Sequence, residues 1–257
     1  MACRAGVDQA CDEDRLSPAS HGFSRSLLSA HPAESGAAGG EGVDPEEFQQ
    51  YFIAQGRFTA GTATMYPPSM ITAEAMFQHL AEGFPVGMRF HSAPVVRLAD
   101  AKPLHLGHVA RADCAWRVYI FADQNDPTRG HSRARELCAF LESAASPIKR
   151  FTPMGADPDS VIDVRAIFQQ GHRDLAVDKM PPVLLPRKGK FGLIDYEKMF
   201  CPDPNGDDIF ELRGVNRETG CMVVVRPDQY VSHVLPFHGH EALADFFAGI
   251  LIPTKRA

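Results

Sequence analysis

Apolar residues recur with two different periods in the middle of the chain. Residues 116–121 (WRVYIF) are rich in aromatic and β-branched side chains, which predicts a β-strand. Residues 131–143 carry apolar side chains three and four positions apart, the spacing of an amphipathic helix. Residues 161–168 predict a second strand, which runs parallel to the first if the helix crosses over between them.

The C-terminal part of the chain continues with a hairpin and a helix. Residues 222–226 and 230–235 are strand-like runs separated by a turn at residues 227–229, which predicts a β-hairpin. Residues 240–252 predict a final helix whose apolar side chains face the sheet: Leu243, Phe246, Phe247 and Ile250. The order strand, helix, strand, variable region, hairpin, helix is that of the thioredoxin fold. We therefore expect an α/β, thioredoxin-like domain in which helices flank a central mixed sheet.

Other segments carry weaker patterns. Residues 73–82 predict a short helix that ends at Gly83 and Pro85. Residues 89–96 and 105–109 are expected to be short extended pieces. In the variable region, residues 195–200 suggest a turn of helix, and residues 209–213 suggest a short helix or strand.

The N-terminal stretch has a different composition. Residues 1–44 are dominated by Ser, Ala and Gly and have no periodic apolar face, so we expect a disordered tail. Its clustered glycines at residues 34–42 have no strand before them and no helix after them, which excludes a dinucleotide-binding loop. Asp44 and Pro45 then provide a capping residue and a first-turn proline, so a helix is expected to begin here.

Charge and hydropathy exclude several classes of partner. The formal net charge of −6 and the sequence pI near 6.0 disfavour a nucleic-acid-binding protein. No run of about 18 apolar residues predicts a membrane span, and no apolar block follows Arg4 as a signal peptide requires. A cytoplasmic location is expected. The six cysteines are irregularly spaced without a Cys-x-x-Cys pair, which favours reduced thiols, several of them in the core.

Thiol redox chemistry is not expected from this sequence. A thioredoxin-type centre needs a thiolate of lowered pKa at the N-terminus of the helix after the first strand. Residues 122–130, which form that connection, contain no cysteine. Such folds also place a cis-proline before the next strand of the hairpin, and residues 217–220 contain no proline.

No other group of residues predicts a catalytic or metal site. His105 with His108, and His238 with His240, are pairs without a third ligand at a suitable spacing. Two aspartate groups are interrupted by Pro or Gly and favour solvated turns rather than calcium loops: Asp157, Asp159 and Asp163, and Asp203, Asp207 and Asp208. No hydrolase, metalloprotease or phosphate-binding motif is present. The sequence thus predicts no catalytic, cofactor-binding or metal-binding residue.

Several segments together resemble one protein family in order along the chain. They are residues 58–61 (FTAG), 83–100 (GFPVGMRFHSAPVVRLAD), 104–108 (LHLGH), 116–121 and 225–236 (VRPDQYVSHVLP). The similarity to the phenol 2-monooxygenase and 3-hydroxybenzoate 4-monooxygenase family of FAD-dependent aromatic hydroxylases spans about residues 46 to 252. The resemblance implies that residues 85–257 are the C-terminal thioredoxin-like dimerisation domain and that residues 45–84 are a remnant of the substrate domain.

The resemblance also implies that catalysis and association belong to different parts of the enzyme. Full-length members use FAD, with NADPH as reductant and oxygen, to hydroxylate a phenolic ring, and their catalytic residues lie mainly in parts that this chain lacks. We therefore expect the chain alone to bind no cofactor and to be inactive, and to act by association as a homodimer or with a separate flavin-binding subunit. An apolar surface left by the absent domains is expected to be exposed. A free-standing interaction module is the alternative, and a thioredoxin-class redox protein is a third hypothesis.

Overall fold

The computed structural model describes residues 45–129 and 132–253. The predicted tail at residues 1–44 lies outside the described residues. The chain divides into two compact units, Met1–Thr59 and Ala60–Ala257. In the first unit the described part is one helix, α2 (Pro45–Thr59), which begins where Asp44 and Pro45 predict it. Within the described residues, no helix is long and apolar enough to cross a lipid bilayer.

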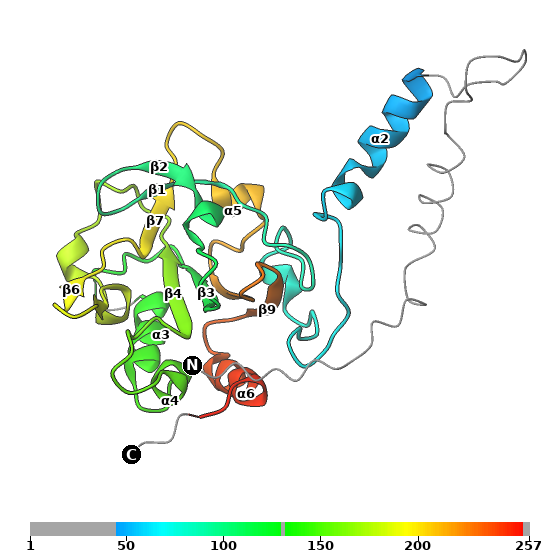
Figure 1. Cartoon of the computed structure of the whole chain (residues 1–257). Coiled ribbons are helices and arrows are strands. Elements are labelled where there is room, and N and C mark those ends of the chain that lie inside the picture. Colours follow the sequence, from blue (N-terminus) through cyan, green and yellow to red (C-terminus); the bar gives the residue numbers. More distant parts are fainter. Residues whose placement is uncertain (1–44, 130–131, 254–257) are drawn as a thin grey trace, which may run out of the picture. The chain divides into compact units, whose positions relative to one another are not determined.

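A mixed β-sheet forms the centre of the second unit (Figure 1). Among the described residues its strand order is β2-β1-β7-β4-β3-β8-β9. The bounds are β1 Pro94–Arg97, β2 Pro103–His105, β3 Trp116–Phe121, β4 Ile162–Ile167, β7 Met199–Pro202, β8 Cys221–Val225 and β9 Val231–Leu235. A separate two-stranded ribbon joins β5 (Arg187–Lys188) to β6 (Leu193–Ile194).

Parallel pairing is confined to the middle of the sheet. Strand β4 pairs in parallel with β3 on one side and with β7 on the other. Strand β8 pairs antiparallel with β3 and continues into the β8–β9 hairpin, while β1 and β2 extend the other edge antiparallel. The parallel β3–β4 pair, the hairpin and the final helix are confirmed, and with them the thioredoxin-like α/β fold.

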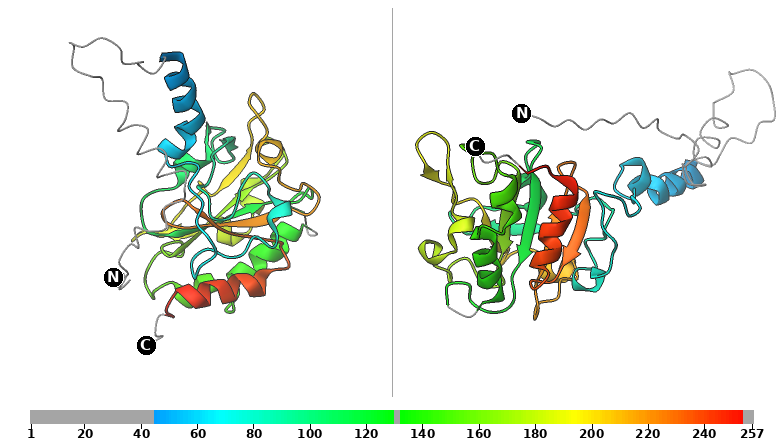
Figure 2. Two further views of the ribbon diagram at one scale, coloured as in Figure 1. Left: turned by 90° about the vertical axis from the view of Figure 1, so that its right-hand side faces the viewer. Right: turned by 90° about the horizontal axis from the view of Figure 1, so that it is seen from below.

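Helices cover one face of the sheet. They are α3 (Arg133–Glu142), α4 (Pro147–Phe151) and α6 (His240–Ile250), and Figure 2 shows α3 and α6 side by side on this face. Because side chains alternate along a strand, Val118 and Ile120 of β3 pack under these helices. Leu243 and Phe247 of α6 are completely buried in the same core, as their helical spacing predicted.

The opposite face of the sheet is covered by coil and by the short helix α5 (Ile209–Leu212). Tyr119 and Phe121 of β3 point to this side. Phe84 and Phe90 stack in parallel with ring centroids 4.7 Å apart, and Phe90 stacks on Tyr119 at 4.6 Å. Such offset aromatic pairs add to the free energy gained from burial. Phe84 therefore belongs to the core of the second unit.

The segment of residues 73–88 also protects the edge strand β9. The backbone N–H of Ala73 donates to the Ser232 carbonyl oxygen (2.8 Å), and that of Val231 donates to Met88 (2.8 Å). An uncovered edge strand would present unpaired backbone groups to other chains. Residues 60–84 are thus packed into the second unit. Their origin as a remnant of a substrate domain stays a prediction.

Three local predictions are wrong. Residues 73–82 form only the 3-10 turn η2 (Gln78–Leu80), because backbone groups at both ends of the segment bond to distant residues: Ala73 to Ser232, and Glu82 to Gly214. Residues 195–200 do not form a helical turn. The chain there enters β7, whose ladder to β4 supplies its backbone partners. Residues 105–109 begin at the end of β2 and continue as the 3-10 turn η3 (Leu106–Val109). For residues 209–213 the sequence left a short helix or a strand open, and the structure has the helix α5 there.

Candidate functional site

The first candidate is the corner where thioredoxin-type proteins hold their thiols, between the end of β3 and the start of α3. In this chain Asp123 occupies the corner and is completely buried. The side-chain amide of Asn125 donates to one carboxylate oxygen of Asp123, and the Ser132 hydroxyl lies 3.4 Å from the other. The side-chain amide of Gln169 donates to the carbonyl oxygens of Ala122 (2.8 Å) and Arg217 (2.7 Å). These hydrogen bonds make the corner a packed junction between loops.

Gly220 closes the same corner from the hairpin side. It adopts a positive φ of 63°, a conformation that favours glycine. A Cβ atom at this position would lie 2.5 Å from the Phe121 carbonyl oxygen and 2.8 Å from the Phe237 ring. The loop is therefore held against β3 by close backbone packing, where a thioredoxin would place its proline.

The buried cysteines of the described residues have thiols that resist ionisation. Cys138 on α3 and Cys221 on β8 are buried, and burial raises the pKa of both thiols well above the ordinary value. Burial also raises the pKa of Cys201 on β7 to about 12. A thiol must ionise to act as a nucleophile. Among the described cysteines Cys114 alone is exposed, and it lies in the loop before β3.

The histidine pairs of the sequence remain pairs in the structure. The rings of His105 and His108 lie 5.5 Å apart between their centroids. His238 and His240 line a pocket of about 580 Å³ together with Phe140 of α3, whose ring centroid is 4.6 Å from that of His240. Over the described ranges, no three His, Cys, Asp or Glu side chains come together as a metal site would need.

One of the two aspartate groups was assigned wrongly. Asp208 is the N-cap of α5 and accepts from the Phe210 N–H, which fits its prediction as a turn residue. Asp163, however, lies inside β4 with only 4% of its side chain exposed. Asp159 pairs with Lys188 and Lys198. Asp159 and Asp163 thus belong to an ion-pair network, because strand and loop fold onto basic residues far along the chain, while Asp157 accepts the Gly189 backbone N–H in a turn.

This network has Asp163 at its centre. Its carboxylate lies 2.6 Å from Lys198 Nζ, 2.8 Å from Arg165 Nε and 3.1 Å from Arg117 Nε. Arg117 stands directly opposite Asp163 in the β3–β4 register, so the sheet itself brings the two charges together. Asp195 adds a second, more exposed carboxylate 3.4 Å from Lys198 Nζ. Buried charges need such partners, because an isolated one would lose its hydration without compensation.

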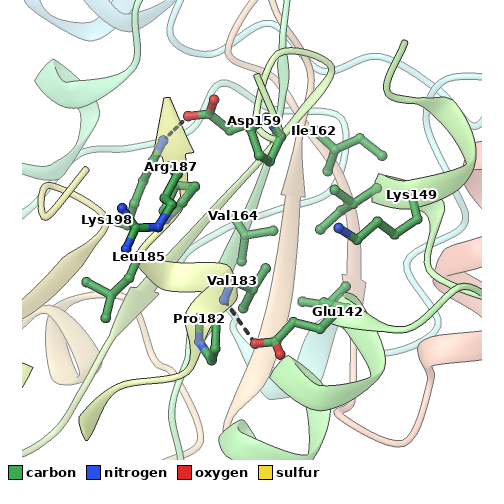
Figure 3. A pocket seen from close by; sticks show the side chains of 14 residues that line it. Glu142, Lys149, Asp159, Ile162, Val164, Pro182, Val183, Leu185, Arg187 and Lys198 are labelled. Atoms are coloured by element: carbon green, nitrogen blue, oxygen red, sulfur yellow. Dashed lines mark hydrogen bonds and ion pairs between the residues drawn. The ribbon is translucent and has the colours of Figure 1, made fainter. Parts of the chain in front are cut away.

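A pocket of about 410 Å³ lies beside this network, on the helical side of the sheet (Figure 3). Its apolar wall is formed by branched side chains and prolines of β4, α3, α4 and the segment around η5 (Pro182–Leu184). Figure 3 shows Lys149 and Arg187 on opposite sides of this pocket, with Val164 between them. The sequence patterns did not indicate this pocket, since its residues come from five separate segments.

Large apolar side chains are exposed near the start of the second unit, and whether they are the surface expected from absent domains stays a prediction. Five large apolar side chains within twelve residues are between 37% and 73% exposed: Met65, Tyr66, Met70, Ile71 and Met76. Thr72 anchors the segment, since it is buried and its hydroxyl accepts from Arg226 at 3.2 Å. We call residues 65–76 the methionine-rich segment. Large apolar side chains that are exposed together in one segment are typical of a contact with another protein surface.

The fold and its corner define a thioredoxin-like domain that carries no thiol pair. Residues 64–255 match the family described as "Phenol hydroxylase, C-terminal dimerisation domain". The chain belongs to this family, which confirms the resemblance read from the sequence. As a dimerisation domain of flavin-dependent monooxygenases of the phenol hydroxylase type, it is expected to form homo-oligomers.

Individual relatives agree with this assignment. The chain is 57% identical over 223 residues to a 3-hydroxybenzoate 4-monooxygenase of Comamonas testosteroni, covering 86% of this chain and 35% of that protein. It is 34% identical over 210 residues to the FAD-dependent monooxygenase terD of Aspergillus terreus, covering 80% of this chain and 34% of that protein. The chain thus spans about a third of the length of these relatives.

Solved structures give a more distant likeness. Copper-bound ScoI of Arabidopsis thaliana aligns with a TM-score of 0.36 and 12% identity, over 62% of this chain and 97% of that one. The thioredoxin-like assignment rests on the strand order and connections described above.

Proposed function

We propose that this chain is the association part of an FAD-dependent aromatic hydroxylase and that it forms a homodimer. The match of residues 64–255 to the dimerisation family carries this proposal. The relative from Comamonas testosteroni supports 3-hydroxybenzoate or a similar phenol as the substrate class of the whole flavoenzyme. FAD, reduced by NADPH, would be held by other parts of that enzyme, as would the catalytic residues.

The methionine-rich segment supports the proposal from the structural side. Methionine side chains are flexible and polarisable, so they adapt to a partner surface. Met70 is 73% exposed, although it belongs to a segment that is fixed to the edge of the sheet. We infer that this surface contributes to the contact between two copies.

Sedimentation velocity of the purified chain tests the association. A homodimer has twice the 28.2 kDa mass of the chain. Met70→Asp is expected to shift the population to monomer, because the contact would have to bury a charge. Met154→Asp is the matched control, since Met154 is 78% exposed outside this segment. A monomeric wild type would refute homodimerisation, and dissociation by Met154→Asp alone would refute the assigned surface.

Visible absorbance of the same sample, before and after incubation with FAD, tests whether this chain itself binds the flavin. A colourless dimer that retains no flavin is expected. Stoichiometric flavin in the isolated chain would contradict the proposal that other parts of the enzyme hold FAD. A chain that stays monomeric but dimerises with an added flavin-binding polypeptide would instead support pairing with a separate subunit.

A further inference from the structure

The pocket beside the buried ion network has the size and the lining of a small-molecule site. Its volume of about 410 Å³ lies in the range of ligand pockets, and such pockets are mostly apolar with a few polar groups that orient the ligand. Ile162 and Val164 of β4 form its floor, and Leu141 of α3 packs at the side. An apolar ligand body could lie on this floor and displace water from it.

Charge in the pocket is unevenly distributed. Among the lining residues, Lys198 is neutralised by Asp159 and Asp163, and Glu142 accepts the Val183 backbone N–H at 2.9 Å. Asp159 is therefore matched by a lysine, whereas Glu142 is held by a neutral donor and keeps its charge.

Two basic side chains at the rim remain without an acid. Within the described part of the chain, neither Lys149 nor Arg187 forms an ion pair. Among the described residues, the Arg187 guanidinium donates to the Gly192 carbonyl oxygen, at 3.1 Å. In Figure 3 the amino group of Lys149 extends toward the interior of the pocket. The rim of the pocket therefore has an excess of positive charge, although the net charge of the whole chain is −6.

We propose that this pocket binds a small organic monocarboxylate with a compact apolar body. The carboxylate would pair with Lys149 and Arg187, and the body would lie against Ile162 and Val164. Metal binding does not suit the site, because Asp159 is already engaged by lysines. The inference goes beyond the proposed function, since it gives the association domain a ligand site of its own.

Benzoate and benzamide provide a matched pair of probes. They have nearly the same shape, and only benzoate carries a charge. Ligand-observed NMR and isothermal titration of the whole chain are expected to show saturable binding of benzoate, with a dissociation constant on the order of 1 mM for so small a ligand. Benzamide is expected to bind at least about fivefold more weakly, because it cannot form the ion pairs.

Charge-removing variants locate the site. Lys149→Gln and Arg187→Gln are each expected to weaken benzoate binding about fivefold, the effect of losing one exposed ion pair. Both side chains are exposed, so the variants should fold, and thermal unfolding checks this. Lys102→Gln is the control, because it removes one positive charge from an exposed position between β1 and β2.

Three outcomes would overturn the proposal. They are the absence of saturable benzoate binding, equal binding of benzoate and benzamide, and a loss of affinity in Lys102→Gln that equals the loss in the pocket variants. Sedimentation of the same variants separates this proposal from the first one. Loss of benzoate binding in an intact dimer would support the pocket alone, and a monomeric wild type that still binds benzoate would refute only homodimerisation.

Discussion

Replacing Asp163 by Asn removes the central charge of the buried network without changing the shape of the side chain. The wild-type carboxylate contacts Arg117, Arg165 and Lys198 at 2.6–3.1 Å. The side chains of Arg117 and Lys198 are only 3% and 2% exposed, so water cannot replace the lost partner. An amide offers one acceptor oxygen and no charge, and it adds two N–H donors beside three cations.

The expected loss of stability in Asp163→Asn follows from this burial. Removing one partner of a buried ion pair typically destabilises a protein by about 3–5 kcal/mol. Arg117 keeps Asp113, and Lys198 keeps Asp159 and Asp195, so we expect the lower part of this range, about 3 kcal/mol. For a domain of about 200 residues, each kcal/mol lowers Tm by about 2–4 °C. Asp163→Asn is therefore expected to lower Tm by about 6–12 °C.

Thermal and urea unfolding followed by circular dichroism measure the change. Asp100→Asn is the control, because Asp100 is 46% exposed and pairs with Arg97 at the surface, and its loss should cost about 1 kcal/mol or less. The double variant Asp163→Asn with Lys198→Met should be less destabilised than the sum of the single variants, since it removes a positive and a negative charge together. Equal destabilisation by Asp163→Asn and Asp100→Asn would refute the reasoning.

Three further predictions use other parts of the structure. Gly220→Ala should destabilise the chain by about 2 kcal/mol or more, because the added Cβ would meet the Phe121 carbonyl. Gly155 has open space around it, so the control Gly155→Ala should cost only about 1 kcal/mol. Chemical denaturation measures the free energy of unfolding of both variants. Thiol titration should lose one fast-reacting group in Cys114→Ser, and a fast reaction of the three buried thiols would contradict their raised pKa values. Burial opposes ionisation of Asp159, but its lysine partners outweigh this and lower its pKa. The stability that it contributes should thus be complete above about pH 4 and decline as the pH falls further, so that the difference in unfolding free energy between wild type and Asp159→Asn shrinks toward pH 2.

The elements that the sequence predicted correctly are those with a strong local period. Strand β3 and helix α3 each contain enough apolar residues at one spacing to define both the element and its buried side. The same holds for the hairpin and α6, and the order of these elements indicated the thioredoxin-like fold. The lack of a cysteine at residues 122–130 and of a proline at residues 217–220 is likewise visible in the sequence, because it depends only on which residues occupy two short loops.

Other elements depend on partners that are distant in sequence. Strand β7 has four residues and follows a lysine, so its local pattern is ambiguous, and pairing with β1 and β4 makes it a strand. The extent of the wrongly predicted helix at residues 73–82 was likewise decided by hydrogen bonds to β9 and to the α5 region.

The sequence by itself determined the secondary-structure order, the family resemblance and the lack of a thiol pair, since these are properties of short segments. The tertiary structure alone decided the burial of Asp163 and the position of the pocket between Lys149 and Arg187. Alternating polar residues on a strand give no information about what covers their face. The charges of Arg117, Asp163 and Lys198 become a buried network only when the β3–β4 register and the start of β7 bring them within hydrogen-bonding distance.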